Sequence, residues 1–262
     1  MGSISDLPED MTYRDKLGPP EFFAARYRPL LIAILATAAL SLVAILYPQI
    51  DLWVSRQFYE PGLGFPSTRD PWLLALRWLG RVVPGIFVGG LIVLVAMRLW
   101  KQKPLAEFTD RALLFLAACF ALGPGLLVNL VLKSYWGRVR PISTDVFGGG
   151  SPFTPAWWPW GGCQANCSFV SGEASTAMVL IAFAFVAPAK WRRAIVAATL
   201  IWTALVSLNR IAFGAHFLSD VVISCGLTLV VVLALKALML DRGVETPATP
   251  VQPVSLDHRT PT

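Results

Sequence analysis

The sequence predicts an all-α fold, a polytopic membrane protein built as a bundle of six transmembrane helices. Composition is the first reason: hydrophobic residues make up 55% of the 262 residues and charged residues only 15%, whereas soluble proteins are about a quarter charged. The second reason is that long apolar runs recur along the chain, with polar connections between them. A mean hydropathy of +0.60 also disfavours the alternative, buried helices in a soluble protein.

Six apolar runs define the expected helices. A helix needs about 17–25 residues to cross the hydrocarbon core. The runs that begin at Ala174 and Ala194 are shorter, so we expect them to recruit flanking residues or to cross a thin region. The six runs are Leu30–Leu46, Val82–Ala96, Ala112–Leu132, Ala174–Pro188, Ala194–Leu208 and Val221–Leu240.

The chain divides into three expected segments. Residues 1–28 are polar and do not resemble a cleaved signal peptide; their last part, Glu21–Arg28, pairs aromatic residues with arginines and suits a helix end in the membrane interface. Residues 29–240 form the six-span core. Residues 241–262 are rich in Pro and Thr and lack an apolar period, which predicts a disordered tail.

Lysine and arginine residues predict the orientation. They cluster in the N-terminal segment, in "MRLWKQKPLAEFTDR" of the second connection and in "AKWRR" of the fourth. The positive-inside rule places these segments in the cytoplasm, so the first, third and fifth connections face outward. The net charge of +6 then reflects topology and contact with membrane lipids, and we expect neither nucleic acid nor an obligate protein as a partner. The first connection has arginines too, but they are widely spaced and mixed with acids: Arg56, Arg69, Arg77 and Arg81.

The four cysteines fall into two groups. Cys119 and Cys225 lie within apolar runs and are expected to be small apolar fillers. Cys163 and Cys167 lie in the third connection, where an oxidising compartment would allow a short disulfide but would not require one. Two cysteines without a nearby histidine have too few ligands for a zinc site.

Charged residues concentrate at the ends of the apolar runs that face the outward connections. Charges near membrane spans are costly, which favours a functional role, although any single one could instead reach for the interface. The three segments are "LKSYWGRVRP", with Lys133, Arg138 and Arg140; "CSFVSGEAS", with Ser171, Gly172 and Glu173; and "LNRIAFGAHFLSD", with Arg210, His216 and Asp220.

Any histidine chemistry is expected at His216. The sequence contains two histidines, and His258 lies in the expected tail. Asp220 follows His216 by four residues, so the two share a helix face if the sixth span begins here. A carboxylate beside imidazole fixes its tautomer and leaves the other nitrogen free to attack or to take a proton. The alternative is a capping aspartate near an interfacial histidine.

The basic residues and a helix N-terminus together suggest a phosphate site. Arginine binds phosphoryl oxygens with two parallel hydrogen bonds, and lysine adds a point charge. Ser171 and Gly172 would offer N–H groups at the start of the fourth span, where the helix dipole favours an anion. Glycine would allow the backbone to approach a ligand closely.

These residues resemble the signature of the type 2 phosphatidic acid phosphatase (PAP2) superfamily, Lys-x6-Arg-Pro, Ser-Gly-His and Arg-x5-His-x3-Asp. The order and spacings agree over the six-span core, in Lys133 with Arg140-Pro141, in Ser171-Gly172, and in Arg210, His216 and Asp220. The resemblance implies phosphoester hydrolysis without a metal or other cofactor. His216 would attack phosphorus and form a phosphohistidine with support from Asp220, and water would then release phosphate. The implied phosphate-binding residues are Lys133, Arg140, Ser171, Gly172 and Arg210.

The chain departs from this signature at two positions. Asn209 replaces the usual serine before Arg210, and it can still form hydrogen bonds. Glu173 stands where the family has the histidine that protonates the leaving oxygen. Three interpretations of Glu173 stay open: a general acid, a carboxylate that orients the ligand or pairs with an arginine, or a sign of weakened catalysis.

The third connection bears on the substrate. Its segment "GGGSPFTPAWWPWGG" suggests a lid or a membrane anchor, with Trp157, Trp158 and Trp160 at headgroup level. The Ser-Gly-Glu variant and this loop resemble bacterial lipid A phosphatases of the superfamily, particularly those acting at the 4′ position. This resemblance implies a lipid phosphate substrate and a site on the periplasmic face of the bacterial inner membrane. Phosphatidylglycerol phosphate, phosphatidate and polyprenyl diphosphate are alternative substrates, and a lipid phosphotransferase or a lipid-binding or transport protein are alternative functions.

Overall fold

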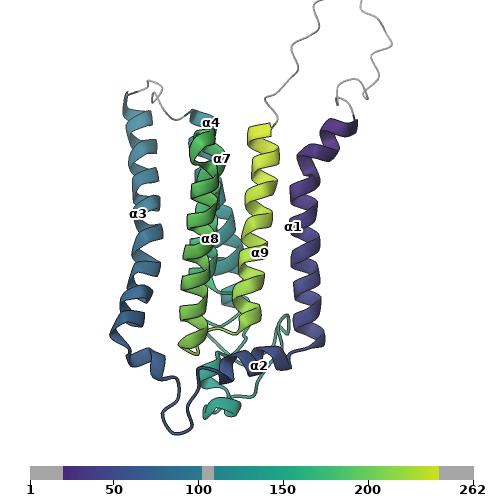
Figure 1. The fold of residues 1–262 in the computed structure, drawn as a ribbon, viewed down its shortest axis with the longest axis vertical. Coiled ribbons are helices and arrows are strands. Elements are labelled where there is room, and N and C mark those ends of the chain that lie inside the picture. The colour runs from purple at the N-terminus through teal and green to yellow at the C-terminus, as the bar shows by residue number, and fades with distance from the viewer. Residues whose placement is uncertain (1–19, 102–108, 242–262) are drawn as a thin grey trace, which may run out of the picture.

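The computed structural model describes residues 20–101 and 109–241, and within these ranges the fold is all-α without a β-strand. Long helices run side by side as a bundle (Figure 1), which confirms the predicted fold class. Most of the N-terminal segment expected over residues 1–28, and all but the first residue of the expected tail, lie outside the described residues.

The long helices follow the predicted apolar runs and extend most of them. The third run is one continuous helix of three segments, and so is the fourth. The bounds are α1, Pro20–Leu46; α3, Pro71–Lys101; α4, η3 and α5, Asp110–Phe120, Ala121–Leu132 and Lys133–Tyr135; α6, η6 and α7, Gly172–Met178, Val179–Ala182 and Phe183–Val186; α8, Ala189–Ala212; and α9 and η7, Leu218–Leu235 and Lys236–Leu240.

Five of these helices in the described residues are long and apolar enough to cross a membrane, so six full spans are not confirmed. The exception is the helix over Gly172–Val186, for which the sequence already predicted a short run. Its residues are largely buried, with Ala174, Ala177 and Val179 fully shielded, because α8, α9 and η3 surround it. A helix enclosed by protein need not match the thickness of the hydrocarbon core. The run at Ala194, in contrast, recruits residues at both ends and becomes the 24-residue α8.

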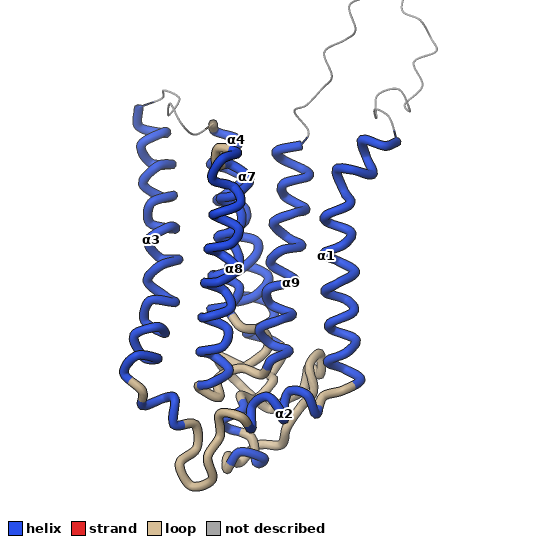
Figure 2. The backbone as a smooth tube through the Cα atoms, in the orientation of Figure 1, coloured by secondary structure: helices blue, strands red, loops and turns tan. Residues whose placement is uncertain are grey.

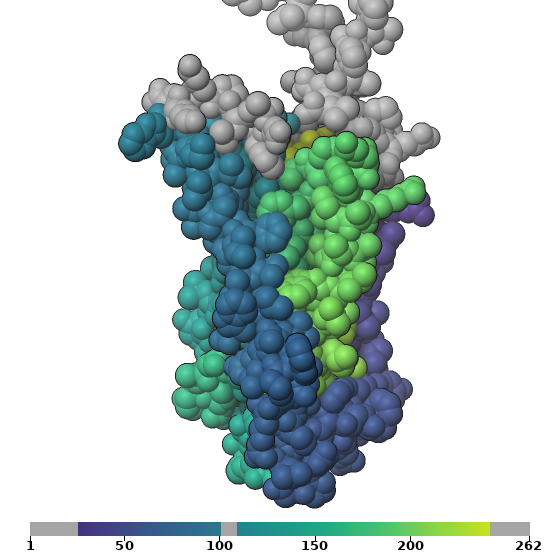
Figure 3. Space-filling model, turned by 60° about the vertical axis from the view of Figure 1, so that its left-hand side comes forward, coloured from purple at the N-terminus to yellow at the C-terminus, as the bar shows by residue number. Residues whose placement is uncertain are grey.

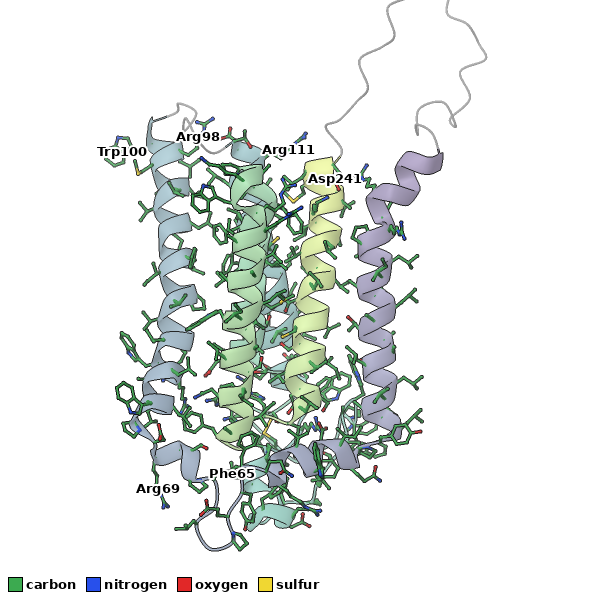
Figure 4. All side chains as sticks on the ribbon, viewed as in Figure 1. Phe65, Arg69, Arg98, Trp100, Arg111 and Asp241 are labelled. Atoms are coloured by element: carbon green, nitrogen blue, oxygen red, sulfur yellow. A yellow bond between two sulfur atoms is a disulfide. The ribbon has the colours of Figure 1, made fainter. Side chains whose placement is uncertain are left out.

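The connections alternate between the two ends of the bundle as the sequence predicts. Figure 4 places Arg98, Arg111 and Asp241 at one end and Phe65 and Arg69 at the other. The first, third and fifth connections meet at the second end, where Phe65, Phe147 and Phe217 form one hydrophobic cluster. We call this end the outward end.

A short helix of the first connection, α2 (Gln49–Arg56), lies across the outward end (Figure 2). Its Trp53 is exposed, whereas Asp51 and Ser55 are buried against the bundle. Three single turns complete this layer: η2, Pro66–Arg69; η4, Pro141–Ser143; and η5, Asp145–Phe147.

The third connection is compact and cross-linked. Cys163 and Cys167 form a disulfide, while Cys119 and Cys225 are free and lie within helices. Trp157 packs against Trp136 and Phe169 and therefore belongs to the core. The other two tryptophans of this loop, at positions 158 and 160, are exposed as an interfacial belt requires.

Candidate active site

His216 lies in the five-residue connection between α8 and α9 and is 2% exposed. Its Nδ1 is 2.8 Å from the backbone carbonyl oxygen of Ser168. A carbonyl only accepts hydrogen bonds, so Nδ1 carries the proton and Nε2 keeps a free lone pair. Burial lowers the pKa of His216 well below its usual range, and the positive charges of Arg210, Arg140 and Lys133 lower it further. The ring is therefore neutral at neutral pH.

Asp220 does not hold His216 in the way that the sequence suggests. Helix α9 begins at Leu218, so His216 precedes it and the two do not share a helix face. The carboxylate Oδ2 of Asp220 is 3.9 Å from Nδ1, which is too long for a hydrogen bond. Asp220 instead accepts from the Ser168 hydroxyl at 2.5 Å and the Phe217 amide at 2.8 Å. Asp220 thus positions Ser168, and the carbonyl of Ser168 fixes the tautomer.

Arg138, for which sequence reasoning assigned no role, connects Asp220 to α2. Its side chain is fully buried, and its guanidinium donates to Asp220 at 2.6 Å and to Asp51 at 2.8 Å. The Ser219 hydroxyl joins the same network: it accepts from Arg138 at 2.8 Å and donates to Asp51 at 2.5 Å. The Nε of Arg138 donates to the carbonyl of Thr154. We call these buried residues the brace: Asp51, Arg138, Ser168, Ser219 and Asp220.

The brace uses Arg138 as a structural cation. Every guanidinium nitrogen donates to a protein acceptor, and the face of the guanidinium lies 4.4 Å from the Phe217 ring centroid. Burial alone would lower the pKa of Arg138, but the carboxylates of Asp220 and Asp51 outweigh burial and raise it. No nitrogen is left for a phosphate.

Lys133, Arg140 and Arg210 form a second group around His216, because each acts electrostatically on the imidazole. Arg140 donates from two nitrogens to the carbonyl of Asn166, at 3.1 and 2.8 Å. Arg210 is 3% exposed, yet its Nε and Nη1 have no hydrogen-bond partner among the described residues. Burial lowers the pKa of Arg140 while Glu173 opposes that shift. We call Lys133, Arg140, Glu173 and Arg210 the anion site.

Glu173 faces Arg210 within the anion site. Its Oε2 lies 3.2 Å from Nε of Arg210, and the carboxylate side chain is 22% exposed. Of the three open interpretations, the geometry directly displays arginine pairing. Glu173 also lines a cavity of about 390 Å³ together with Arg81, Asn129, Lys133 and Thr176, so the carboxylate stands at an opening that a headgroup could use.

The start of α6 differs in part from the predicted phosphate cradle. The Ser171 hydroxyl caps the helix by accepting from the Ala174 amide, and the Ser171 amide donates to the Asp220 carbonyl at 3.2 Å. Ser171 therefore has no free N–H for phosphate, which corrects the prediction. The amides of Gly172 and Glu173 have no acceptor among the described residues and remain available.

Gly172 has a packing reason in addition to any ligand. A Cβ at this position would lie 2.5 Å from the Asn129 side-chain oxygen, so glycine lets α6 approach η3 without a shift of the Asn129 side chain. Asn209, the other departure from the signature, is 3% exposed and donates to the Leu73 carbonyl at 2.9 Å. This hydrogen bond links α8 to α3.

Two arginines of α3 extend the positive charge, and sequence reasoning used them only to judge orientation. Arg77 and Arg81 both act electrostatically on Arg210, and Arg77 also acts on Arg140. Their spacing of four residues places them on one helix face. That spacing was the signal available in the sequence, but it could not show that this face turns toward the site.

A family model described as the PAP2 superfamily matches residues 113–243 of the chain. A lipid A 4′-phosphatase of Rhizobium leguminosarum is 49% identical over 117 residues, which cover 45% of this chain and 50% of that protein. A lipid A 4′-phosphatase of Francisella tularensis subsp. novicida is 34% identical over 185 residues, 70% of this chain and 82% of that protein. The match thus spans only half the length of the Rhizobium protein.

The fold also resembles a solved structure, a transmembrane PAP2 type phosphatidylglycerolphosphate phosphatase from Bacillus subtilis. The TM-score is 0.55 at 20% sequence identity, and the match covers 84% of this chain and 98% of that one. At this identity the likeness supports the fold.

Proposed function

Because the chain belongs to the PAP2 superfamily, we propose that it is a membrane lipid phosphatase that removes a phosphate monoester from lipid A, with the 4′-phosphate as the preferred position. One observation carries the proposal: a buried, neutral His216 with a free Nε2 lies among the positive charges of Lys133, Arg140 and Arg210. The choice of lipid A rests on the two relatives described above.

In the proposed reaction, Nε2 of His216 attacks phosphorus and the lipid alkoxide leaves. The lone pair forms the N–P bond as the P–O bond breaks, and water later attacks the phosphohistidine to release inorganic phosphate. The guanidinium of Arg210, whose Nε and Nη1 have no hydrogen-bond partner among the described residues, stabilises the charge on the equatorial oxygens together with Lys133 and Arg140. The carbonyl of Ser168 stabilises the ring while it carries positive charge.

Glu173 combines two roles in this proposal. It pairs with Arg210, and a phosphate that binds Arg210 competes for the same guanidinium. The carboxyl group freed from Arg210 would lie beside the phosphate; as the general acid it gives its proton to the leaving alkoxide oxygen, and it regains a proton from the water that later attacks the phosphohistidine. Glu173 is thus proposed as the general acid that replaces the histidine of the family signature.

The proposed location is the bacterial inner membrane with the site on the periplasmic side. Two observations support this orientation. Arg98 and Arg111, which flank the basic second connection, lie at the end opposite Phe65 and Arg69, and the Cys163–Cys167 disulfide at the outward end suits an oxidising compartment. Membrane lipids are the proposed surroundings, and the proposed reaction needs neither nucleic acid nor a protein partner.

The test is mass spectrometry of lipids after incubation with the purified protein. Lipid A, phosphatidylglycerol phosphate, phosphatidate and polyprenyl diphosphate are offered separately, and His216→Ala is the matched control. We expect loss of one phosphate from lipid A, about 10⁴-fold slower in the variant, and unchanged turnover in EDTA. Turnover by His216→Ala, or activity restricted to another lipid, would contradict the proposal. Phosphate release that requires an acceptor lipid would indicate a phosphotransferase.

A further inference from the structure

The residues around the anion site and the brace carry more positive charge than one phosphate requires. Arg77 and Arg81 act on the anion site in addition to Lys133, Arg140 and Arg210. Glu173 is the carboxylate within that site, and the two carboxylates of the brace are shared with Arg138. Within this group of nine residues, Arg138 included, the six cations outnumber the three carboxylates by three, whereas a phosphate monoester carries at most about two negative charges.

Arg77 lies close to the anion site and forms no ion pair with a carboxylate among the described residues. Its guanidinium carbon lies 5.7 Å from the Phe213 ring centroid, as does that of Arg210, so one ring contacts both cations. The Nε of Arg77 is buried and has no hydrogen-bond partner among the described residues. Within residues 20–101 and 109–241, no carboxylate forms an ion pair with Arg77 or Arg81.

Arg81 extends this surface toward the cavity. It is exposed and lines the cavity of about 390 Å³ with Lys133, Gly172 and Glu173. Helix α3 forms an outer face of the bundle next to α8 (Figure 3), so a bulky headgroup can reach both arginines from the side. Two like charges four residues apart destabilise a helix, and no described carboxylate lies close enough to form an ion pair with either arginine. The fold alone therefore gives no reason for the pair.

We propose that Arg77 and Arg81 form a second anion-binding subsite, which binds a further phosphate or carboxylate group of the lipid headgroup while His216 attacks the phosphate in the anion site. This proposal rests on the lipid phosphatase function and narrows its substrate class to lipids with at least two anionic groups. The arginine fork binds such groups with two hydrogen bonds, so both arginines select the substrate and His216 performs the reaction.

The first test compares one lipid with one and with two phosphates, in a neutral detergent. Arg77→Gln, Arg81→Gln and the double variant are measured beside Arg69→Gln, an exposed arginine in η2, just before α3. We expect the ratio of kcat/KM for the doubly over the singly phosphorylated lipid to fall about tenfold in the double variant, mainly because KM rises. In Arg69→Gln the ratio should not change. Arg81→Lys should restore part of it. An equal loss on both lipids, or no loss, would overturn the subsite.

A binding experiment keeps the subsite separate from the reaction. The same substitutions are made in the His216→Ala protein, and binding of both lipids is titrated without turnover. We expect the doubly phosphorylated lipid to bind about tenfold more weakly when both arginines are replaced. A wild-type protein that binds with this preference but hydrolyses neither lipid would refute the phosphatase proposal alone. An effect that appears only when anionic phospholipid is added would assign the arginines to the bilayer surface and overturn the subsite.

Discussion

Arg138 and Arg210 are both buried at the outward end, but one is fully paired and the other is not. Arg138 of the brace donates from all its nitrogens, to Asp51, Asp220, Ser219 and a backbone carbonyl. Arg210 of the anion site lies beside Glu173 with two nitrogens lacking hydrogen-bond partners. The comparison teaches that burial does not identify a ligand-binding arginine, whereas unused donors do. The brace is held together by its own hydrogen bonds, whereas the anion site keeps donors that the proposed ligand would use.

The largest expected effect follows from breaking the brace. Arg138→Met removes the cation shared by Asp51 and Asp220, and two carboxylates then remain buried without a partner. We expect the free energy of unfolding to fall by about 3–5 kcal/mol, measured by thermal unfolding in detergent. A variant as stable as the wild type would show that the brace does not hold the outward end together.

The matched substitution in the anion site should act on the reaction. Arg210→Met removes the unused donors, so we expect kcat/KM to fall about 10²–10³-fold while the unfolding temperature stays within a few degrees. Phosphate release and unfolding are measured on the same samples as for Arg138→Met. If both variants lose stability to the same extent, the distinction between brace and anion site is wrong.

A smaller effect sharpens the role of Glu173, the partner of Arg210. As a general acid it matters most when the leaving group is poor, so Glu173→Gln should slow an alkyl phosphate about 10–100-fold more than an aryl phosphate. The measurement is the ratio of kcat/KM for the two substrates. If kcat/KM falls equally for the alkyl and the aryl phosphate, Glu173 is not the general acid and only its pairing with Arg210 remains.

The smallest effect concerns pH. The pKa of His216 is lowered by burial and then by Arg210, Arg140 and Lys133, and the neutral ring is the active form. Activity is therefore lost only as pH falls through the lowered pKa, so the acid limb of kcat/KM should lie below pH 6.5. Arg140→Gln removes one positive charge and should move the limb upward by up to about one pH unit. Because the substrate titrates equally with both proteins, a limb that stays in place would contradict this electrostatic account.

Much of the fold and of the anion site could be predicted from the sequence. The apolar runs located the helices because a membrane requires long uninterrupted apolar segments. The spacing of Lys133, Arg140, Arg210 and His216 predicted a shared site, and the structure brings their charges together. The apolar runs are local in the sequence, and the site residues lie at the spacings of a family motif, so both could be recognised without the structure.

The brace could not be predicted, because its contacts are long-range or involve backbone atoms. Asp51 meets Ser219 across 168 positions of sequence, and nothing near Asp51 indicates such a partner. The carbonyl of Ser168, which fixes the His216 tautomer, belongs to no side-chain pattern. The N–H of Ser171 was expected to be free and is instead paired with the Asp220 carbonyl, since packing of α6 on α9 determines its acceptor.

The enclosed helix over Gly172–Val186 has a consequence for how the protein responds to its lipid environment. The outer helices α1 and α3 are mostly uncovered, and exposed spans accommodate a change of hydrocarbon thickness by tilting. The enclosed helix contacts protein on nearly all sides, so its first residue keeps a constant height relative to the connection that holds His216. Turnover measured across bilayers of different acyl length should therefore vary little, with the outer helices absorbing the mismatch.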